Sequence, residues 1–251
     1  EKIDCDDPVE RQEEELLSII PKDRKRSYEM RDIVKLVFDK DSFFEMTKYF
    51  GRGIITGFAR INGYPVAIFA NDSNFYAGSM SAEGAQKTTR FIKLCDTFKL
   101  PIVSLVDEPG FLIGPDAEKA GTILHGTEAV LATTESQVPW TTIMIRKSFG
   151  VAAAAHYGPD GYVLAWPSAE SGPLPLEGGV AVAFKKEIAA AKDPEAKRKE
   201  LEEKMAKNQN PFPRAEAFSV HEIIDPRETR KYIAMWAERI QSQLRASLVM
   251  K

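Results

Sequence analysis

The fold is decided by the stretch Arg146-Lys147-Ser148-Phe149-Gly150-Val151-Ala152-Ala153-Ala154-Ala155-His156. It follows Trp140 to Ile145, a β-branched run that predicts a strand, and it consists largely of residues with almost no side chain. A strand that turns into a helix through Gly150 presents free N–H groups at the helix start, where the helix dipole adds partial positive charge. Such a start can hold an oxyanion. The alternative is a Gly/Ala-rich helix start that packs tightly against a neighbouring sheet.

A second helix start of the same kind lies upstream. A buried strand predicted over Ile102 to Val106 is followed by a loop through Gly114 and then by Ala120-Gly121-Thr122, where another helix begins. Adjacent parallel strands bring their carboxyl ends to one edge of a sheet, where the ligands of open α/β folds bind. We therefore expect the N–H of Gly121 to converge on one oxygen with those at the start through Gly150. Loss of one such donor typically costs on the order of 100-fold or more in rate.

Strands and helices alternate along the middle of the chain. Two β-rich runs over residues 54–61 and 64–71 flank Asn62-Gly63, which is the pattern of a tight hairpin. A long helix is predicted over residues 81–98 from its apolar spacing. Together with the two strands described above, this order predicts an α/β fold with a parallel sheet built from right-handed crossovers.

The two ends of the chain differ from this middle part. Residues 1–52 are expected to form a helical lead-in that docks onto the rest, with a short acidic helix over residues 8–20 and another helix over Met30 to Val37, and residues 53–251 to form the main domain. The mixed-sign stretch 185–208 predicts a solvated helix with pairs of opposite charge. A final amphipathic helix is predicted through Leu248.

Composition excludes several classes of function. The chain has 251 residues, of which 43% are apolar, so it can bury a large core, and its net charge of -3 gives no reason to expect a nucleic-acid partner. Cys5 and Cys95 lack the spacing of a metal site or of a disulfide framework. No apolar run reaches the roughly 18–20 residues of a membrane span, and the acidic N-terminus is unlike a signal peptide. We expect a soluble protein of the cytoplasm or, in a eukaryote, of the mitochondrial matrix.

Motifs along essentially the whole chain resemble those of one family. They include Arg31-Asp32-Ile33-Val34, Gly57-Phe58-Ala59-Arg60-Ile61-Asn62-Gly63-Tyr64-Pro65-Val66, Asp107-Glu108-Pro109-Gly110-Phe111, Gly121-Thr122-Ile123-Leu124-His125-Gly126, Arg146-Lys147, Trp166-Pro167-Ser168-Ala169-Glu170 and Ile224-Asp225-Pro226-Arg227-Glu228-Thr229-Arg230. Their order resembles the crotonase superfold. The closer resemblance is to the C-terminal half of the carboxyltransferase (β) subunit of biotin-dependent acyl-CoA carboxylases, of the propionyl-CoA carboxylase and transcarboxylase type.

The resemblance implies a crotonase-like ββα superhelix and a carboxyltransferase activity. Such a subunit transfers CO2 from carboxybiotin on a carrier protein to the α carbon of a short-chain acyl-CoA, so the cofactors implied are biotin and a coenzyme A thioester. The partners implied are biotin carboxylase, the biotin carrier protein, an N-terminal carboxyltransferase half and further copies of the chain in a trimer or hexamer. No metal is implied.

The resemblance also implies site residues. The proposed catalytic donors are the amides of Gly121, Val151 and Ala152, beside Gly150. Residues expected to line the biotin and CoA site are Ala120, Phe111, Gly114, His125, Ala153, Ala154 and Arg146. The family commonly has Gly-Gly-Ala followed by Tyr-Asp where this chain has residues 150–154, so an acidic residue associated with acyl-chain selection is absent.

Several ionisable side chains admit two interpretations. His125 could contact ligand or pack between helices, and His156 is expected in the core more than at the site. Glu170 could act as an acid, and Arg146 could contact a carboxylate of a ligand or pair with one of the protein. Asp107, Glu108 and Glu118 could orient ligand or protein groups, although an acid next to Pro-Gly is also ordinary turn chemistry.

Two other functions compete with carboxyl transfer. One is a self-sufficient crotonase-type decarboxylase or hydratase that acts on acyl-CoA, and the absence of a pair of well-placed acids argues mildly against it. The other is a non-catalytic assembly subunit, which Val151 and Ala154 favour because the family prefers other residues there.

Overall fold

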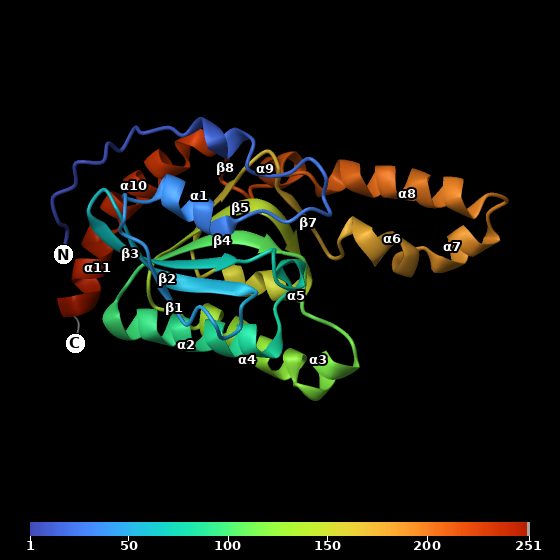
Figure 1. Ribbon diagram of the computed structural model, residues 1–251, viewed down its shortest axis with the longest axis horizontal. Coiled ribbons are helices and arrows are strands. Elements are labelled where there is room, and N and C mark those ends of the chain that lie inside the picture. The colour runs from blue at the N-terminus through green and yellow to red at the C-terminus, as the bar shows by residue number, and fades with distance from the viewer. Residues whose placement is uncertain (250–251) are drawn as a thin grey trace.

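A single mixed sheet organises the chain in a computed structural model that describes residues 1–249 (Figure 1). Its eight strands are β1 (Phe44–Met46), β2 (Ile54–Ile61), β3 (Tyr64–Asn71), β4 (Ile102–Glu108), β5 (Trp140–Phe149), β6 (Tyr162–Ala165), β7 (Glu170–Gly172) and β8 (Glu222–Ile223). The strands follow the order β1-β2-β3-β4-β5-β6-β8, and β7 pairs with the end of β5. From β3 onward every pairing is parallel, as the alternation of strands and helices predicts.

Helices cover both faces of this sheet (Figure 1). They are α1 (Met30–Val37), α2 (Ala82–Phe98), α3 (Pro115–Lys119), α4 (Thr122–Thr134), α5 (Gly150–Ala153), α6 (Leu176–Ala183), α7 (Lys185–Ala190), α8 (Pro194–Gln209), α9 (Phe212–Glu216), α10 (Thr229–Arg239) and α11 (Gln241–Val249), with short 3-10 turns η1 (Glu14–Leu17), η2 (Tyr76–Gly78), η3 (Ala154–His156) and η4 (Pro226–Glu228). One apolar cluster joins α1 and α10 to one face of the sheet, and a second joins α2 and α4 to the other. The sheet is therefore buried on both sides, as parallel sheets are.

The predicted hairpin and the helix after it are confirmed. Asn62 and Gly63 both have positive φ, 48° and 76°, so the turn matches the right-handed twist of its strands. Gly63 also lies so close to the carbonyl of Ile3 that a Cβ would not fit. The helix begins where its cap predicts, because the Ser81 hydroxyl accepts the N–H of Gly84.

The lead-in contributes to the same core as the rest of the chain. β1 pairs antiparallel with β2, so residues 1–52 are not purely helical, and the helix predicted over residues 8–20 is wrong, because only the 3-10 turn η1 forms there. On α1, Ile33, Val34 and Val37 are fully buried in the cluster that contains Ile68 of β3. The predicted boundary at residues 52 and 53 therefore does not separate two cores.

The strand before Gly150 is longer than the sequence predicts. Its expected end was Ile145, but β5 continues to Phe149, and every residue of it is buried. The extension passes a register shift between Val106 and Glu108, where the Asp107 carboxylate accepts the N–H of Lys147 at 3.0 Å in place of a ladder carbonyl. A side chain of β4 thus continues the pairing after the regular ladder ends.

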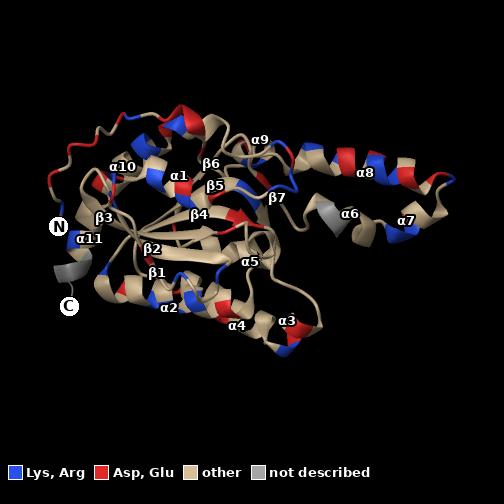
Figure 2. Cartoon of the chain, viewed as in Figure 1, with Lys and Arg blue, Asp and Glu red and all other residues tan. Residues whose placement is uncertain are grey.

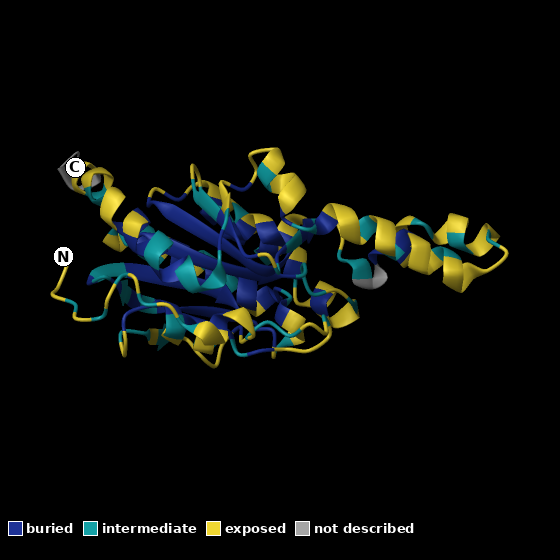
Figure 3. Ribbon diagram, turned by 90° about the horizontal axis from the view of Figure 1, so that it is seen from above, coloured by how far each residue is buried: buried dark blue, intermediate teal, exposed yellow. Residues whose placement is uncertain are grey.

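A helical hairpin projects from the carboxyl end of the sheet. It comprises α6, α7 and α8, and Figure 3 shows that most of its residues are exposed. Along α8 the charges alternate in sign (Figure 2), with Arg198 donating to Glu202 at 2.8 Å. The charged and solvent-exposed character predicted for residues 185–208 is confirmed, but two helices, α7 and α8, replace the single predicted helix because the chain breaks at residues 191–193 before Pro194. The predicted C-terminal helix is divided at Ile240 into α10 and α11. Within residues 1–249 the structure contains no helix with the length and hydrophobicity of a membrane span.

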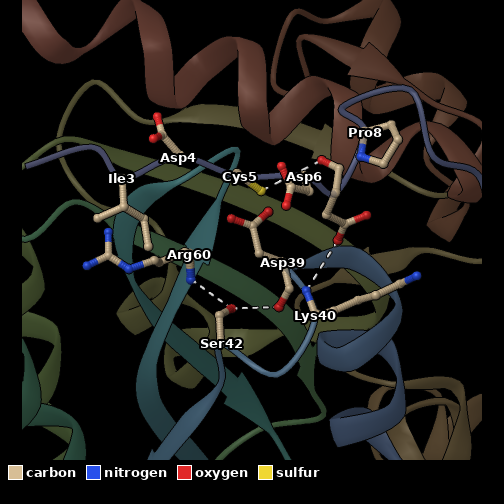
Figure 4. A pocket seen from close by; sticks show the side chains of 10 residues that line it. Ile3, Asp4, Cys5, Asp6, Pro8, Asp39, Lys40, Ser42 and Arg60 are labelled. Carbon is tan, nitrogen blue, oxygen red and sulfur yellow. Dashed lines mark hydrogen bonds between the residues drawn. The ribbon is translucent and has the colours of Figure 1, made fainter.

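The N-terminal segment is held to the domain by buried polar contacts (Figure 4). Asp39 accepts the N–H groups of Asn62 and Gly63 at 2.9 and 2.8 Å, which fixes the hairpin turn. The guanidinium of Arg230, only 1% exposed, donates to the same carboxylate at 2.8 Å and to the carbonyl of Pro8 at 2.8 Å. Asp39 lines the acidic pocket in Figure 4 together with Asp4, Cys5 and Asp6. Its carboxylate holds the hairpin turn and Arg230 in place.

We predict that Arg230→Gln lowers the free energy of unfolding by about 3 to 5 kcal/mol, because it leaves the buried Asp39 carboxylate without its counter-charge. The measurement is urea unfolding at neutral pH. The control, Arg227→Gln, removes a surface pair with Asp225 and should leave stability unchanged within error. Equal effects of the two substitutions would contradict the structural role given to Arg230.

Candidate active site

The helix start after β5 has the features that the sequence predicts for an oxyanion site. Gly150 takes φ of 64°, which a glycine adopts without strain, and it turns the chain sharply out of the strand. Val151 has no positive φ, so its branched side chain is not strained there, and that side chain is 69% exposed. Ala152 is fully buried.

The amides of this turn are available as donors. The first N–H groups of a helix have no partner within the helix. The N–H groups of Val151 and Ala152 make no hydrogen bond to a turn or loop of the described chain, whereas Gly150 adjoins the last pair of the β5–β7 ladder, Phe149 with Gly172. Their neighbour η3 is anchored from behind, since Thr142 Oγ1 donates to the carbonyl of His156 at 2.8 Å and Thr133 Oγ1 to that of Ala155 at 2.9 Å. The turn is therefore fixed while its amides stay free.

The second predicted donor is not free. Helix α4 does begin at Thr122 with Gly121 as its cap, and α4 packs against η3, so the two segments are neighbours. However, the Gly121 N–H donates to the carbonyl of Glu118 at 3.0 Å, because residues 115–119 form the short helix α3 and not a loop. The prediction that Gly121 offers a free N–H is therefore wrong for this structure. Ala120, beside it, is exposed and donates to the carbonyl of Asp116 at 3.0 Å.

Other predicted ligand contacts have partners within the protein. The His125 ring lies 2.8 Å from Gln86 Nε2 and 3.0 Å from Glu128 Oε2, so it links α4 to α2. The Phe111 ring packs directly on Gly126, where no Cβ would fit. Gly114, at φ of 114°, caps α3. Ligand contacts of these three residues remain predictions, but each residue also has a structural role here.

Arg146 pairs with a carboxylate of the protein, which is the second of the two roles considered for it. Its Nη2 and Nε donate to Asp107 at 2.8 and 3.1 Å, its Nη1 donates to the carbonyl of Arg26 at 2.8 Å, and its guanidinium lies over the Tyr28 ring. It is 6% exposed. Arg146 thus holds β4, β5 and the lead-in together at the carboxyl edge of the sheet. Glu170 pairs with Arg24 near the same edge.

A buried acid and a buried imidazole lie beneath this edge. Glu108 accepts the N–H of Gly110 and the side-chain amide of Asn71, both at 2.9 Å. The Nε2 atom of His156 lies 3.7 Å from Glu108 Oε2 and has no hydrogen-bond partner among the described residues. Its Nδ1 atom contacts Ser104 Oγ at 2.9 Å, and its ring stacks on Phe69. The core position expected for His156 is confirmed.

Burial keeps both groups of this pair neutral. It raises the pKa of Glu108 to about 8, against the opposing effect of its hydrogen bonds, and it lowers the pKa of His156 to about 3. The sequence leaves Glu108 either as a group that orients ligand or protein or as part of a turn, and it does not connect Glu108 to His156. The only available signal was an acid at the end of a buried strand, which is too common to assign.

Three more polar residues, which the sequence does not predict at the site, lie beside α5. Ser148 Oγ and Tyr157 OH are 2.7 Å apart, and Ser171 of β7 is buried next to them. They line a cavity that also reaches Gly150, Ala153 and Ala154. Within residues 1–249, no group of three or more His, Cys, Asp or Glu side chains is arranged to hold a metal ion.

The parallel sheet and the helix start after β5 define a crotonase-like carboxyltransferase fold, as the solved structures confirm. Transcarboxylase 12S, solved with methylmalonyl-coenzyme A and methylmalonic acid bound, superposes with a TM-score of 0.89 at 35% identity, over 96% of this chain and 47% of that one. The family model of the carboxyl transferase domain matches residues 1–250. The chain belongs to this family.

Curated relatives agree with this placement. The carboxyltransferase subunit of propionyl-CoA carboxylase from Haloferax mediterranei is 40% identical over 230 residues, which are 90% of this chain and 44% of the relative. The methylmalonyl-CoA decarboxylase subunit alpha from Propionigenium modestum is 36% identical over 232 residues, 91% of this chain and 45% of the relative. The chain thus spans about half the length of the relatives it matches.

We predict that the Glu108–His156 pair makes stability depend on pH. The folded state binds an extra proton at Glu108 between pH 4.5 and 8, so the free energy of unfolding falls as pH rises through that window. His156 acts in the opposite sense between pH 3 and 6.5, because only the unfolded imidazole takes up a proton there. The two slopes oppose each other between pH 4.5 and 6.5, and only that of Glu108 remains above pH 6.5.

The test compares urea unfolding at pH 6.5 and 8. We expect the wild type to lose about 2 kcal/mol between them and Glu108→Gln to lose much less. Glu118→Gln, at an exposed position on α3, is the matched control and should behave as the wild type. The same pH dependence in Glu108→Gln and wild type would rule out a neutral Glu108.

Proposed function

We propose that this chain is the C-terminal part of the carboxyltransferase of a biotin-dependent acyl-CoA carboxylase. The observation that carries the proposal is the pair of free N–H groups at Val151 and Ala152, at the carboxyl end of the central strand, in a chain of the carboxyl transferase family. Its relatives include a propionyl-CoA carboxylase subunit, which supports a short-chain acyl-CoA as substrate.

The arrangement suits a reaction in which charge develops on oxygen. An acyl thioester that gives up its α proton, for which the ureido nitrogen left after loss of CO2 would be the acceptor, carries negative charge on its carbonyl oxygen, and its α carbon then forms the new C–C bond to CO2. The amides of Val151 and Ala152 would donate to that oxygen without rearrangement, since η3 already holds the turn in place. Gly150 has no side chain to block the approach, and that of Val151 points to solvent.

The cofactor that the family implies also carries an oxygen that needs donors. Biotin bound as carboxybiotin supplies the CO2. A ureido oxygen needs the same kind of donors as a thioester oxygen, and the amides of Val151 and Ala152 are already assigned to the thioester oxygen. The part of the chain that the structure describes offers no second pair of free amides at Gly121, so the partner half is expected to supply the other donors.

The assembly is part of this proposal. We infer an N-terminal carboxyltransferase half, biotin carboxylase and the biotin carrier protein as partners, and a trimer or hexamer of carboxyltransferase units, as the hexamer assembly described for transcarboxylase 12S supports. The compartment expected is the cytoplasm or the mitochondrial matrix.

A decarboxylase is the second candidate, and the relative from Propionigenium modestum favours it. The same amides would stabilise the enolate left when a malonyl-type thioester gives up its carboxyl group. The deciding experiment mixes the chain with candidate N-terminal halves, biotin carrier protein and methylmalonyl-CoA. Carboxylation of the carrier supports carboxyl transfer, CO2 release by the lone chain supports a self-sufficient decarboxylase, and a stable complex without turnover supports an assembly subunit.

The donor role predicts the effect of Val151→Pro. Proline removes the N–H but is accepted in the first turn of a helix, so the fold should persist while turnover of the complex falls on the order of 100-fold or more. Val151→Ala keeps the N–H and serves as the control. Turnover that is equal in the two variants, with unchanged circular dichroism, would remove Val151 from the site.

A further inference from the structure

A cavity of about 330 Å³ lies beside the helix start, between the end of β5, β7 and the segment around α9. Its lining includes Ser148, Ala154, Tyr157, Ser171 and Arg214. The catalytic step proposed above uses none of these side chains. The cavity touches Gly150, so a substrate whose thioester oxygen lies at the free amides can extend into it.

The floor of this cavity offers neutral hydrogen-bond donors. Ser148 and Tyr157 hydroxyls contact each other at 2.7 Å, and burial raises the pKa of Tyr157 to about 12, so the phenol keeps its proton at neutral pH. Ser171 is only 6% exposed, and its Oγ has no hydrogen-bond partner among the described residues. A buried hydroxyl without a partner is costly, so a bound ligand atom would satisfy it.

The charge on the cavity is positive. Arg214 is exposed on α9 at its rim and close enough to Tyr157 to act on the phenol electrostatically. Within residues 1–249, no ion pair engages Arg214, and no Asp or Glu lines the cavity. Met144 and Val220 supply apolar walls. A site with an apolar wall, one guanidinium and the hydroxyls of Ser148, Tyr157, Ser171 and Ser219 matches a short alkyl chain that ends in a carboxylate.

We propose that this cavity binds the distal carboxylate of a dicarboxylic acyl-CoA, so that the chain prefers acyl groups with a free carboxylate at the end remote from the thioester. The inference rests on the proposed function for the position of the thioester. The Arg214 guanidinium pairs with the negative charge of this carboxylate, and Ser171 and Tyr157 donate hydrogen bonds to it.

The carboxylate in question is a spectator and not the one transferred. An ion pair with Arg214 stabilises a carboxylate in the ground state, which raises the barrier to its loss or formation as CO2. A permanent cation is therefore suited to a group that stays unchanged during the reaction. Methylmalonyl-CoA, which carries only the transferable carboxylate, should gain little from Arg214.

The test is a calorimetric titration of the chain with glutaryl-CoA, pentanoyl-CoA and methylmalonyl-CoA. We expect glutaryl-CoA to bind roughly 10- to 100-fold more tightly than pentanoyl-CoA, which has the same chain length without the second charge. Arg214→Gln should abolish this preference, and Ser171→Ala should reduce it. Arg198→Gln, which removes an exposed arginine from α8, is the matched control and should retain it.

The outcomes separate this inference from the proposed function. Equal or undetectable binding of glutaryl-CoA and pentanoyl-CoA, an unchanged preference in Arg214→Gln, or an Arg214-dependent preference for methylmalonyl-CoA over glutaryl-CoA would each overturn it. The carboxyl-transfer assay of the assembled complex is read independently. Transfer to pentanoyl-CoA without any preference for glutaryl-CoA would leave the proposed function in place and remove only the carboxylate subsite.

Discussion

The ion pair between Asp107 and Arg146 is the interaction on which the carboxyl edge of the sheet depends. Both side chains are buried, with contacts of 2.8 and 3.1 Å, and the same carboxylate accepts the N–H of Lys147. At this point the regular ladder between β4 and β5 shifts register. A carboxylate therefore replaces a backbone carbonyl, and a guanidinium that also holds the carbonyl of Arg26 ties the lead-in to the same place.

The position of the helix start follows from this arrangement. Because β5 is held past the shift as far as Phe149, the chain can leave the sheet only at Gly150, whose positive φ turns it into α5. Below the turn, Glu108 and His156 fill the space with two neutral polar groups, which avoids a buried charge next to the amides. The result is a turn with buried support and open N–H groups, a combination that suits stabilisation of an oxyanion.

The sequence predicts those parts of the fold whose signals are local. Asn62-Gly63 identifies the hairpin and Ser81 the start of α2, because turn and cap preferences act over a few residues. The helix start at Gly150 is marked by the loss of side chains after a strand. Such signals also support the resemblance to the carboxyltransferase family, which the comparisons confirm over the whole chain.

The features that the sequence does not predict depend on contacts between distant residues. The extension of β5 needs Asp107 from β4, and polar Arg146, Lys147 and Ser148 gave no sign of a buried strand. The Gly121 N–H is not free, because it donates to the carbonyl of Glu118 in the one-turn helix α3. That helix is too short to be predicted from the periodicity of its apolar residues.

The cavity beside α5 likewise combines Tyr157 with Ser171 and Arg214, which no spacing rule connects. Patterning thus locates the site, but tertiary packing decides which groups remain free to act in it.

Amide hydrogen exchange at Val151 and Ala152, followed by NMR, tests the central claim most directly. In the free chain these amides should exchange rapidly, because no carbonyl of the protein protects them. In the complex with the partner half and an unreactive acyl-CoA enolate analogue, exchange at Val151 and Ala152 should slow markedly. Protection that is already present in the free chain, or exchange that the analogue leaves unchanged, would contradict the claim that these amides hold the oxyanion.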